Sequence, residues 1–160
     1  MAIQVGDSLP QTTLKQVTPS ETKDIQTDSL FKGKTVALFA IPGAFTPTCT
    51  NIHMPGFNKH MDTFKAKGVE VACLAVNDPF VMDAWAKATN SHSDILILAD
   101  WNADFTKAVG LTLDGSGAGL GLRSLRYSML VKDGVVAVLN IEPSAGACDI
   151  SSADTLLKSL

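Results

Sequence analysis

One short stretch holds residues whose types and spacing suit thiol chemistry. Cys49 follows Thr46 and Pro42 in the string Pro-Gly-Ala-Phe-Thr-Pro-Thr-Cys, directly after the apolar run 35–41. Such a run is typical of a strand buried on both faces, and the Thr-Pro-Thr before the cysteine favours the start of a helix. Cys49 would then lie in the first helical turn, where free N–H groups and the helix dipole stabilise an anion. The stretch therefore predicts a reactive thiolate.

The same stretch resembles a known active-site signature. Pro42, Thr46 and Cys49 form Pro-x-x-x-Thr-x-x-Cys, followed by His-Met-Pro-Gly-Phe, and this order resembles the signature of peroxiredoxins. It is most similar to the peroxiredoxin 5 subgroup, which includes the plant type II enzymes, and the similarity runs from Val5 to Met129. The resemblance implies a thioredoxin-like fold and a thiol-specific peroxidase of hydrogen peroxide and small organic hydroperoxides, active in antioxidant defence. Thioredoxin, or glutaredoxin with glutathione, would restore the enzyme, and we expect no cofactor.

Cleavage of a peroxide needs an ionised sulfur and hydrogen-bond donors aimed at both oxygens. We expect Cys49 to be the nucleophile and the Thr46 hydroxyl to donate to the sulfur or to a peroxide oxygen. Arg126 and Arg123 are the two arginines of the chain. The guanidinium of either one offers several hydrogen-bond donors and would stay charged. In the peroxiredoxin pattern the arginine directly precedes an aromatic residue and a buried strand, so the resemblance selects Arg126. Pro42 would shield the sulfur from water.

Two further cysteines could react with a sulfenic acid formed on Cys49 and give a disulfide. Cys73 lies in the apolar run 69–76 and is expected to be inert core, whereas Cys148 follows a flexible Pro-Ser-Ala-Gly-Ala loop. The resemblance supports Cys148 as the resolving thiol, because animal-type members carry a resolving cysteine in a similar late loop containing Glu-Pro. Plant type II members instead have a second cysteine near position 73, so Cys73 stays the alternative. Bonding requires the two α-carbons to come within roughly 7 Å, which favours local unwinding of the Cys49 turn.

Composition limits the classes of protein to which this chain can belong. With 160 residues, 46% of them hydrophobic and 18% charged, the chain is expected to fold as one domain over residues 1–160. A net charge of −3 argues against a nucleic-acid partner, and no apolar run is long enough for a membrane span. Three cysteines, an odd number, do not form a structural disulfide framework. The first residues resemble neither a signal nor a transit peptide, so the cytoplasm is expected, although a removed transit peptide would leave no trace.

Strand and helix patterns alternate along the chain, as in a parallel sheet with helical crossovers. We expect one or two hairpins over residues 1–34, strands at 35–41, 69–76, 95–99, 127–132 and 135–141, and helices at 48–67, 79–89, 100 or 102 to 109, and 149 or 151 to 160. The last two strands would form a hairpin around Asp133-Gly134. Together the pattern predicts an α/β, thioredoxin-like fold with a central mixed β-sheet flanked by helices.

Two segments of this pattern are irregular. Pro55 has no N–H for the carbonyl of Asn51, so the helix 48–67 should bend there and leave the Cys49 turn easy to unwind, unless the bend only fits the helix to the sheet. Residues 111–126 are expected to form a loop. Its glycines at 115, 117, 119 and 121 do not match Gly-x-Gly-x-x-Gly, so we predict no nucleotide site.

His53 and His60 follow Cys49 along the predicted helix. No carboxylate or further cysteine stands at ligand spacing, so we predict no metal site and expect His53 to order the helix or its neighbouring loop. Apolar residues expected on loops and helix starts near the site suggest a partner surface and a homodimer; they are Phe45, Phe80, Trp85 and Leu120.

Two other functions are open from the residues alone. A thioredoxin-like disulfide oxidoreductase would need a second cysteine where this chain has Thr46, so the dithiol for exchange is missing. A non-catalytic thioredoxin-like binding module would need only the fold, and its Cys49 would react as an ordinary thiol.

Overall fold

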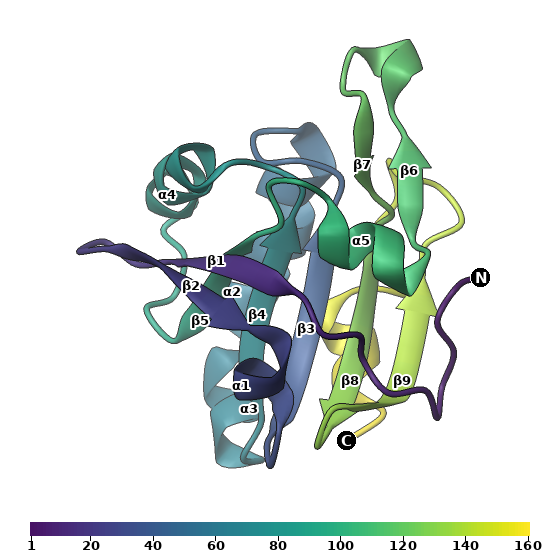
Figure 1. Cartoon of the computed structure of the whole chain (residues 1–160). Helices are drawn as coiled ribbons and strands as arrows, with labels where there is room; N and C mark the ends of the chain where they lie inside the picture. Colours follow the sequence, from purple (N-terminus) through teal and green to yellow (C-terminus); the bar gives the residue numbers. More distant parts are fainter.

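A seven-stranded mixed sheet with the order β2-β1-β5-β4-β3-β8-β9 runs through the molecule (Figure 1). The computed structural model describes residues 1–160. The strands of this sheet are β1 Thr13–Val17, β2 Thr22–Gln26, β3 Thr35–Ile41, β4 Glu70–Ala75, β5 Ile95–Ala99, β8 Tyr127–Lys132 and β9 Val135–Ile141. The neighbours β3, β4 and β5 are parallel, while β1 pairs antiparallel with β5 and β8 antiparallel with β3. The predicted central mixed sheet is thus confirmed.

The central strands are buried on both faces, as their continuous apolar runs predict. Successive side chains of a strand point to opposite faces, so each strand supplies two separate cores. Phe39 and Cys73 face one core, and Leu38 and Leu74 face the other. Cys49 belongs to the first core, so the functional stretch lies on that face of the sheet.

Helices cover both faces of the sheet. Figure 1 shows α1 and α5 in front of the sheet and α2 and α3 behind it. The helices are α1 Thr27–Phe31, α2 Met54–Lys59, α3 Met61–Ala66, α4 Pro79–Ala88, α5 Asp104–Val109 and α6 Ala153–Leu157. Side chains of α2, α3, α4 and α6 pack into the core that contains Cys49, whereas α1 and α5 pack into the other. None of these helices is both long and apolar enough to cross a membrane.

The segment expected as one bent helix over residues 48–67 is instead divided into three pieces. A helical turn that begins at Pro47 passes into a π-helical turn, η1 Cys49–His53, and α2 and α3 follow with a break at His60. The N–H of Met54 donates to the carbonyl of Cys49, five residues earlier. Because Pro55 has no N–H to continue the α-helical pattern, the irregularity falls in the turn before it rather than at the proline.

Residues 111–126 form a hairpin, so the expectation of a loop there is wrong. Strands β6 Thr112–Asp114 and β7 Leu122–Ser124 make a separate two-stranded sheet around a short 3-10 turn, η2 Ser116–Ala118. Glycines at the tip supply left-handed backbone, with φ 76 at Gly119 and φ 68 at Gly121. The hairpin projects from the body of the molecule at the top of Figure 1.

Two helices also differ from expectation. The helix α1 was not predicted, because it is five residues long and carries no clear apolar period. The last helix begins after Ser152, whose hydroxyl accepts from the N–H of Thr155, and not after Asp149 or Ser151. By contrast, Asp78 caps α4 at the predicted start by accepting from Val81.

Candidate active site

The functional stretch begins where β3 ends. Pro42 follows the last residue of β3 and is buried, and the chain then turns back so that Cys49 is fully buried in η1. The thiol thus lies beyond the carboxyl end of a central strand, at the start of a helical segment, as the sequence predicts. The π-helical turn is the unexpected part of this placement.

The Cys49 sulfur has two polar neighbours. Arg126 Nη2 lies 3.0 Å from the sulfur and Thr46 Oγ1 lies 2.9 Å from it. Both groups can donate a hydrogen bond to a thiolate. The structure therefore brings the predicted cysteine, threonine and arginine together at one point.

The Thr46 hydroxyl has two acceptors and one hydrogen. Its oxygen lies 2.7 Å from the carbonyl of Gly43 and 2.9 Å from the Cys49 sulfur, so it donates to one of them at a time. When the sulfur is a thiolate, only the hydroxyl can be the donor of that pair. The Thr48 hydroxyl does not cap the helical turn and donates to the carbonyl of Gly146 instead.

Arg126 is buried, with 1% of its surface exposed, and forms no ion pair with a carboxylate. Its Nε and Nη2 donate to the carbonyl of Ala145 at 3.3 and 3.2 Å. A buried cation without a carboxylate is costly unless another anion compensates it. A thiolate on Cys49 would supply that anion.

A fourth polar residue, His53, completes the cluster. Its Nδ1 lies 3.0 Å from Arg126 Nη1 and its Nε2 lies 2.9 Å from the carbonyl of Ser151. Burial, and then the charge of Arg126, lower the pKa of His53 to about 3, so the ring is neutral at ordinary pH. The sequence predicted only that His53 orders its helix or a nearby loop. The one signal of a site role was its position four residues after the cysteine, on the same side of a helix.

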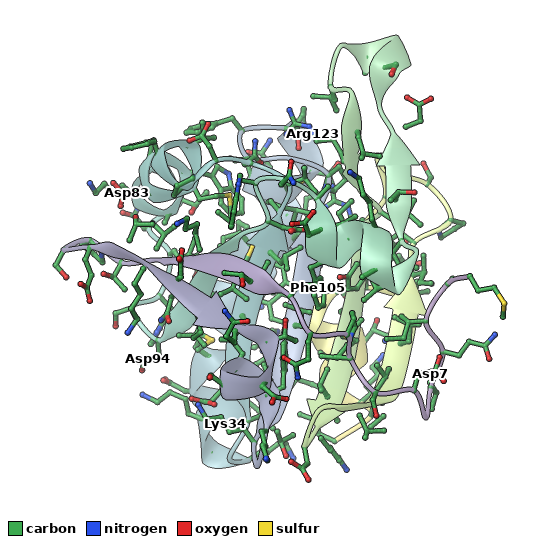
Figure 2. All side chains as sticks on the ribbon, in the orientation of Figure 1. Asp7, Lys34, Asp83, Asp94, Phe105 and Arg123 are labelled. Carbon is green, nitrogen blue, oxygen red and sulfur yellow. The ribbon has the colours of Figure 1, made fainter.

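Arg123, the other arginine, does not contact the sulfur. Its Nε donates to the carbonyl of Leu120 at 2.9 Å and its Nη1 to that of Val76 at 3.1 Å. Figure 2 shows its side chain pointing from the β6–β7 hairpin toward the body of the molecule. A Cβ atom at Gly43 would come within 3.2 Å of Arg123 Nη1, so glycine permits this close approach. Arg123 therefore links the hairpin to the end of β4 and packs close to Gly43.

A cavity of about 420 Å³ lies beside the cluster, between the Cys49 loop, the β6–β7 hairpin and the segment after β9. Its wall is formed by Pro42, Thr46, Pro47, Thr48, Leu113, Asp114, Gly115, Gly117, Ala118, Leu120, Arg126, Ala145 and Gly146. Two of the residues that hold the sulfur, Thr46 and Arg126, thus also line a space open to a small molecule. No group of three or more His, Cys, Asp or Glu side chains is placed to hold a metal ion.

Comparison with known proteins assigns the family. The Redoxin family model matches residues 4–157. The chain is 44% identical to peroxiredoxin-2B of Arabidopsis thaliana, covering 99% of this chain and 98% of that protein. The chain belongs to the peroxiredoxin family. As such it is a thiol-dependent peroxidase, an oxidoreductase with an antioxidant function.

Other peroxiredoxins agree in sequence and in structure. Peroxiredoxin-2E of Arabidopsis thaliana, a chloroplastic protein, is 46% identical over 99% of this chain and 70% of its own length. The crystal structure of reduced Prx3 from Vibrio vulnificus in complex with H2O2 is 47% identical, with a TM-score of 0.90 over 98% of this chain and 95% of that one. The thioredoxin-like fold and the resemblance to the type II group, both expected from the sequence, are thereby confirmed.

The three cysteines of this peroxiredoxin are all free. Cys73 is buried in β4, as predicted. Burial and the nearby Cys49 raise the pKa of Cys73 well above the ordinary value, although the charge of Arg126 acts in the opposite direction. Cys148 is half-buried rather than exposed, and burial raises its pKa too, although Arg126 and Ser151 act in the opposite direction.

The segment that carries Cys148 is held in place at several points. The carboxylate of Glu142 accepts hydrogen bonds from the N–H groups of Asp149 and Ser151 and from the Ser151 hydroxyl. Burial raises the pKa of Glu142, but these hydrogen bonds outweigh it and the pKa is lowered. The segment that was expected to be flexible is therefore held to Glu142, the residue that follows β9.

The apolar residues expected on a partner surface divide into two groups. Phe45 is 55% and Phe80 is 85% exposed, and Leu120 is half-buried. Trp85 is fully buried, and its Nε1 donates to Thr50 Oγ1 at 3.1 Å, so its assignment to the surface is wrong. The α4 face that carries Trp85 packs into the core because the amphipathic pattern of that helix turns Trp85 and Met82 inward.

Proposed function

We propose that Cys49 is the residue of this peroxidase that attacks the peroxide. The sulfur, as a thiolate, would bond to one peroxide oxygen while the O–O bond breaks. The other oxygen leaves as hydroxide or alkoxide and takes up a proton, and the sulfur becomes a sulfenic acid. The observation that carries this proposal is the position of the sulfur between Arg126 Nη2 and Thr46 Oγ1, at 3.0 and 2.9 Å.

The neighbours of Cys49 have separate roles in this step. Four of the five N–H groups of Arg126 have acceptors, which are Ala145 twice, His53 and the sulfur. The remaining N–H of Nη1 is free to donate to a peroxide oxygen, where it stabilises the developing negative charge. The Thr46 hydroxyl orients the peroxide oxygen that the sulfur attacks, and buried Pro42 keeps water from the sulfur.

We propose Cys148 as the thiol that resolves the sulfenic acid. Its sulfur would attack the Cys49 sulfur, a disulfide would form, and the hydroxyl would leave as water. Cys148 is half-buried on a loop that is linked to the site, whereas Cys73 is a fully buried strand residue. The π-helical turn that holds Cys49 supports this route, because such turns are rare and lie frequently at functional sites. Cys73 remains the alternative partner.

The oxidised enzyme then needs an external reductant. We propose thioredoxin, or glutaredoxin with glutathione, because a dithiol protein can reduce a disulfide by exchange. Peroxide consumption coupled to NADPH oxidation, measured with each reductant system separately, would distinguish the two.

We propose a homodimer formed through the exposed rings of Phe45 and Phe80. Light scattering at micromolar concentration should give twice the mass of the chain, and a Phe80→Ser variant should give a monomer. A monomer for the parent protein would exclude the dimer. The relatives include proteins named as chloroplastic, so the cytoplasm stays a prediction that cell fractionation would test.

The peroxidase role of Cys49 is tested by rapid mixing of the reduced protein with hydrogen peroxide. The Cys49→Ser variant should consume no peroxide above the rate of the buffer, because it lacks the attacking sulfur. The Cys73→Ser variant is the matched control, since it removes a buried thiol of the same core, and it should keep the parent rate. A Cys49→Ser protein as fast as the parent would end the proposal.

A further inference from the structure

The imidazole of His53 lies behind the active-site arginine, on the side away from Thr46. It is 1% exposed, and it joins two parts of the site: Arg126 through Nδ1 at 3.0 Å and Ser151 through Nε2 at 2.9 Å. None of the roles assigned above uses this ring. Its contacts nevertheless connect the group that binds the sulfur to the segment that carries Cys148.

The hydrogen bonds of the ring fix its protonation state. A guanidinium has only donors, so Nδ1 must accept from Arg126 and carries no proton. The single proton of the neutral ring is then on Nε2, which donates to the carbonyl of Ser151. A protonated ring would direct an N–H at the guanidinium, and the low pKa of about 3 agrees with this geometry.

Aromatic packing fixes the position of the ring. Its centroid lies 5.0 Å from that of Phe39 on β3 and 5.6 Å from that of Phe57 on α2. Both phenyl rings are tilted by 55° to the imidazole and belong to the packed core, so the imidazole cannot turn without displacing them.

The charged and titratable groups around the ring come from three directions. Arg126 contacts it directly, and Glu142 binds the N–H of the same Ser151 whose carbonyl the ring holds. A cavity of about 350 Å³ on its other side is lined by His53 together with Ile52, Gly56, Cys148, Asp149, Ser152, Ala153, Asp154, Thr155 and Lys158.

The guanidinium has few other restraints. Apart from the sulfur and His53, its only acceptor is the carbonyl of Ala145, at 3.2 and 3.3 Å, which are long distances for hydrogen bonds of a charged donor. The guanidinium is planar, so fixing Nη1 also fixes the direction of Nη2. The contact of Arg126 with His53 thus decides whether Nη2 stays on the Cys49 sulfur.

We propose that His53 is a positioning residue for the peroxidase reaction. Its neutral ring holds Arg126 so that the guanidinium remains on the Cys49 sulfur, and its N–H holds Ser151 at the end of the segment that carries Cys148. The inference rests on the proposed role of Cys49 and Arg126 and assigns the residue that keeps them aligned.

Three substitutions separate the two hydrogen bonds of the ring. His53→Asn keeps an acceptor near the place of Nδ1, His53→Gln keeps a donor near the place of Nε2, and His53→Phe keeps only the ring shape. His60→Gln is the matched control, since His60 lies on the same helical segment and pairs with Asp154 outside the cluster.

Two measurements are made on each reduced protein. One is the second-order rate constant for hydrogen peroxide in stopped flow. The other is the pH profile of iodoacetamide alkylation, followed by mass spectrometry on the peptide that contains Cys49. The second does not depend on peroxidase activity, so a parent protein that fails to consume peroxide overturns the proposed function while the alkylation profile still tests the role of His53.

We expect His53→Phe and His53→Gln to lower the rate constant roughly 10- to 100-fold, because a guanidinium that is no longer held leaves the sulfur. Their alkylation midpoint should rise by about one pH unit. His53→Asn should restore most of both values, and His60→Gln should match the parent. A folded His53→Phe protein whose rate constant is within two-fold of the parent value and whose alkylation midpoint is unchanged would overturn the inference. If His53→Phe does not fold, equal values for His53→Asn and His53→Gln would do so.

Discussion

Arg126 Nη2 lies 3.0 Å from the Cys49 sulfur, although 77 residues separate the two in the chain. The sheet explains this contact. Strand β8 pairs antiparallel with β3, and Tyr127 lies opposite Ala40 near the end of that strand. Arg126 immediately precedes Tyr127, so it enters the fold at the same edge at which Pro42 leaves β3. The register of two central strands thus places the cation on the thiol.

Replacing Arg126 should remove most of the activity. We expect Arg126→Lys to lower kcat/KM for hydrogen peroxide by roughly 100-fold, because a lysine keeps the charge but cannot contact the sulfur and a peroxide oxygen with one planar group. Steady-state peroxide consumption at saturating reductant would measure this loss.

Arg123→Lys serves as the control for this substitution. Arg123 binds the carbonyls of Leu120 and Val76 and not the sulfur, so its loss should loosen the β6–β7 hairpin while lowering kcat/KM less than about five-fold. Equal losses for the two arginines would contradict the assignment of Arg126.

The Thr46 hydroxyl can be tested with an isosteric change. Thr46→Val keeps the shape and removes the donor 2.9 Å from the sulfur, so kcat/KM should fall roughly 10- to 100-fold. Thr46→Ser should recover most of the rate because it restores the hydroxyl. If Thr46→Val and Thr46→Ser had the same rate, the hydroxyl would have no part in the reaction.

Local patterns explain which elements the sequence predicts. The bounds of β3, β5, β8 and β9 agree with their apolar runs, and the Asp133-Gly134 turn has positive φ values of 50 and 79. The β6–β7 hairpin was missed because its strands are three residues long and its glycines indicate irregular structure. Trp85 was misplaced because it was assigned by its position near a predicted helix start and not by the apolar stripe of α4, which turns it inward.

For the active site, too, the sequence predicts contacts within one stretch better than contacts between distant residues. The cysteine, threonine and proline lie within one stretch, so their spacing alone indicates thiol chemistry. The contact of His53 with Arg126 joins residues 73 apart, and no local pattern reports it. The tie between Thr48 and Gly146, which are 98 residues apart, is hidden in the same way. The sequence therefore predicts the sulfur and its donors but not the groups that hold those donors in place.

The route of disulfide formation can be decided with two variants. After one equivalent of peroxide, mass spectrometry of the parent should find Cys49 joined to Cys148, and Cys73→Ser should give the same product. Cys148→Ser should stop at the sulfenic acid, because the raised pKa and full burial of Cys73 leave little reactive thiolate there. A Cys49–Cys73 disulfide in the parent would make Cys73 the resolving thiol instead.

The pH dependence of stability should report the neutral state of His53. Its pKa is about 3 in the folded protein and near 6.5 when the chain unfolds. Between these values the unfolded chain binds a proton that the folded protein excludes, so the free energy of unfolding falls as the pH is lowered. The slope is about half its full value at pH 6.5 and approaches about 1.4 kcal/mol per pH unit near pH 5. Urea unfolding of the parent at pH 6.5, 6 and 5 measures this slope. These pH values lie above the range in which protonation of carboxylates such as Glu142 contributes most to the pH dependence of stability.

The His53→Phe variant lacks the group and should lose this contribution to the slope, whatever its absolute stability. His60→Gln, examined at the same pH values, shows how much of the slope belongs to a second histidine of the same segment. Equal slopes for the parent and His53→Phe would mean that His53 takes up its proton as readily in the folded state as in the unfolded one. In that case its Nδ1 could not be the acceptor that holds Arg126 on the Cys49 sulfur.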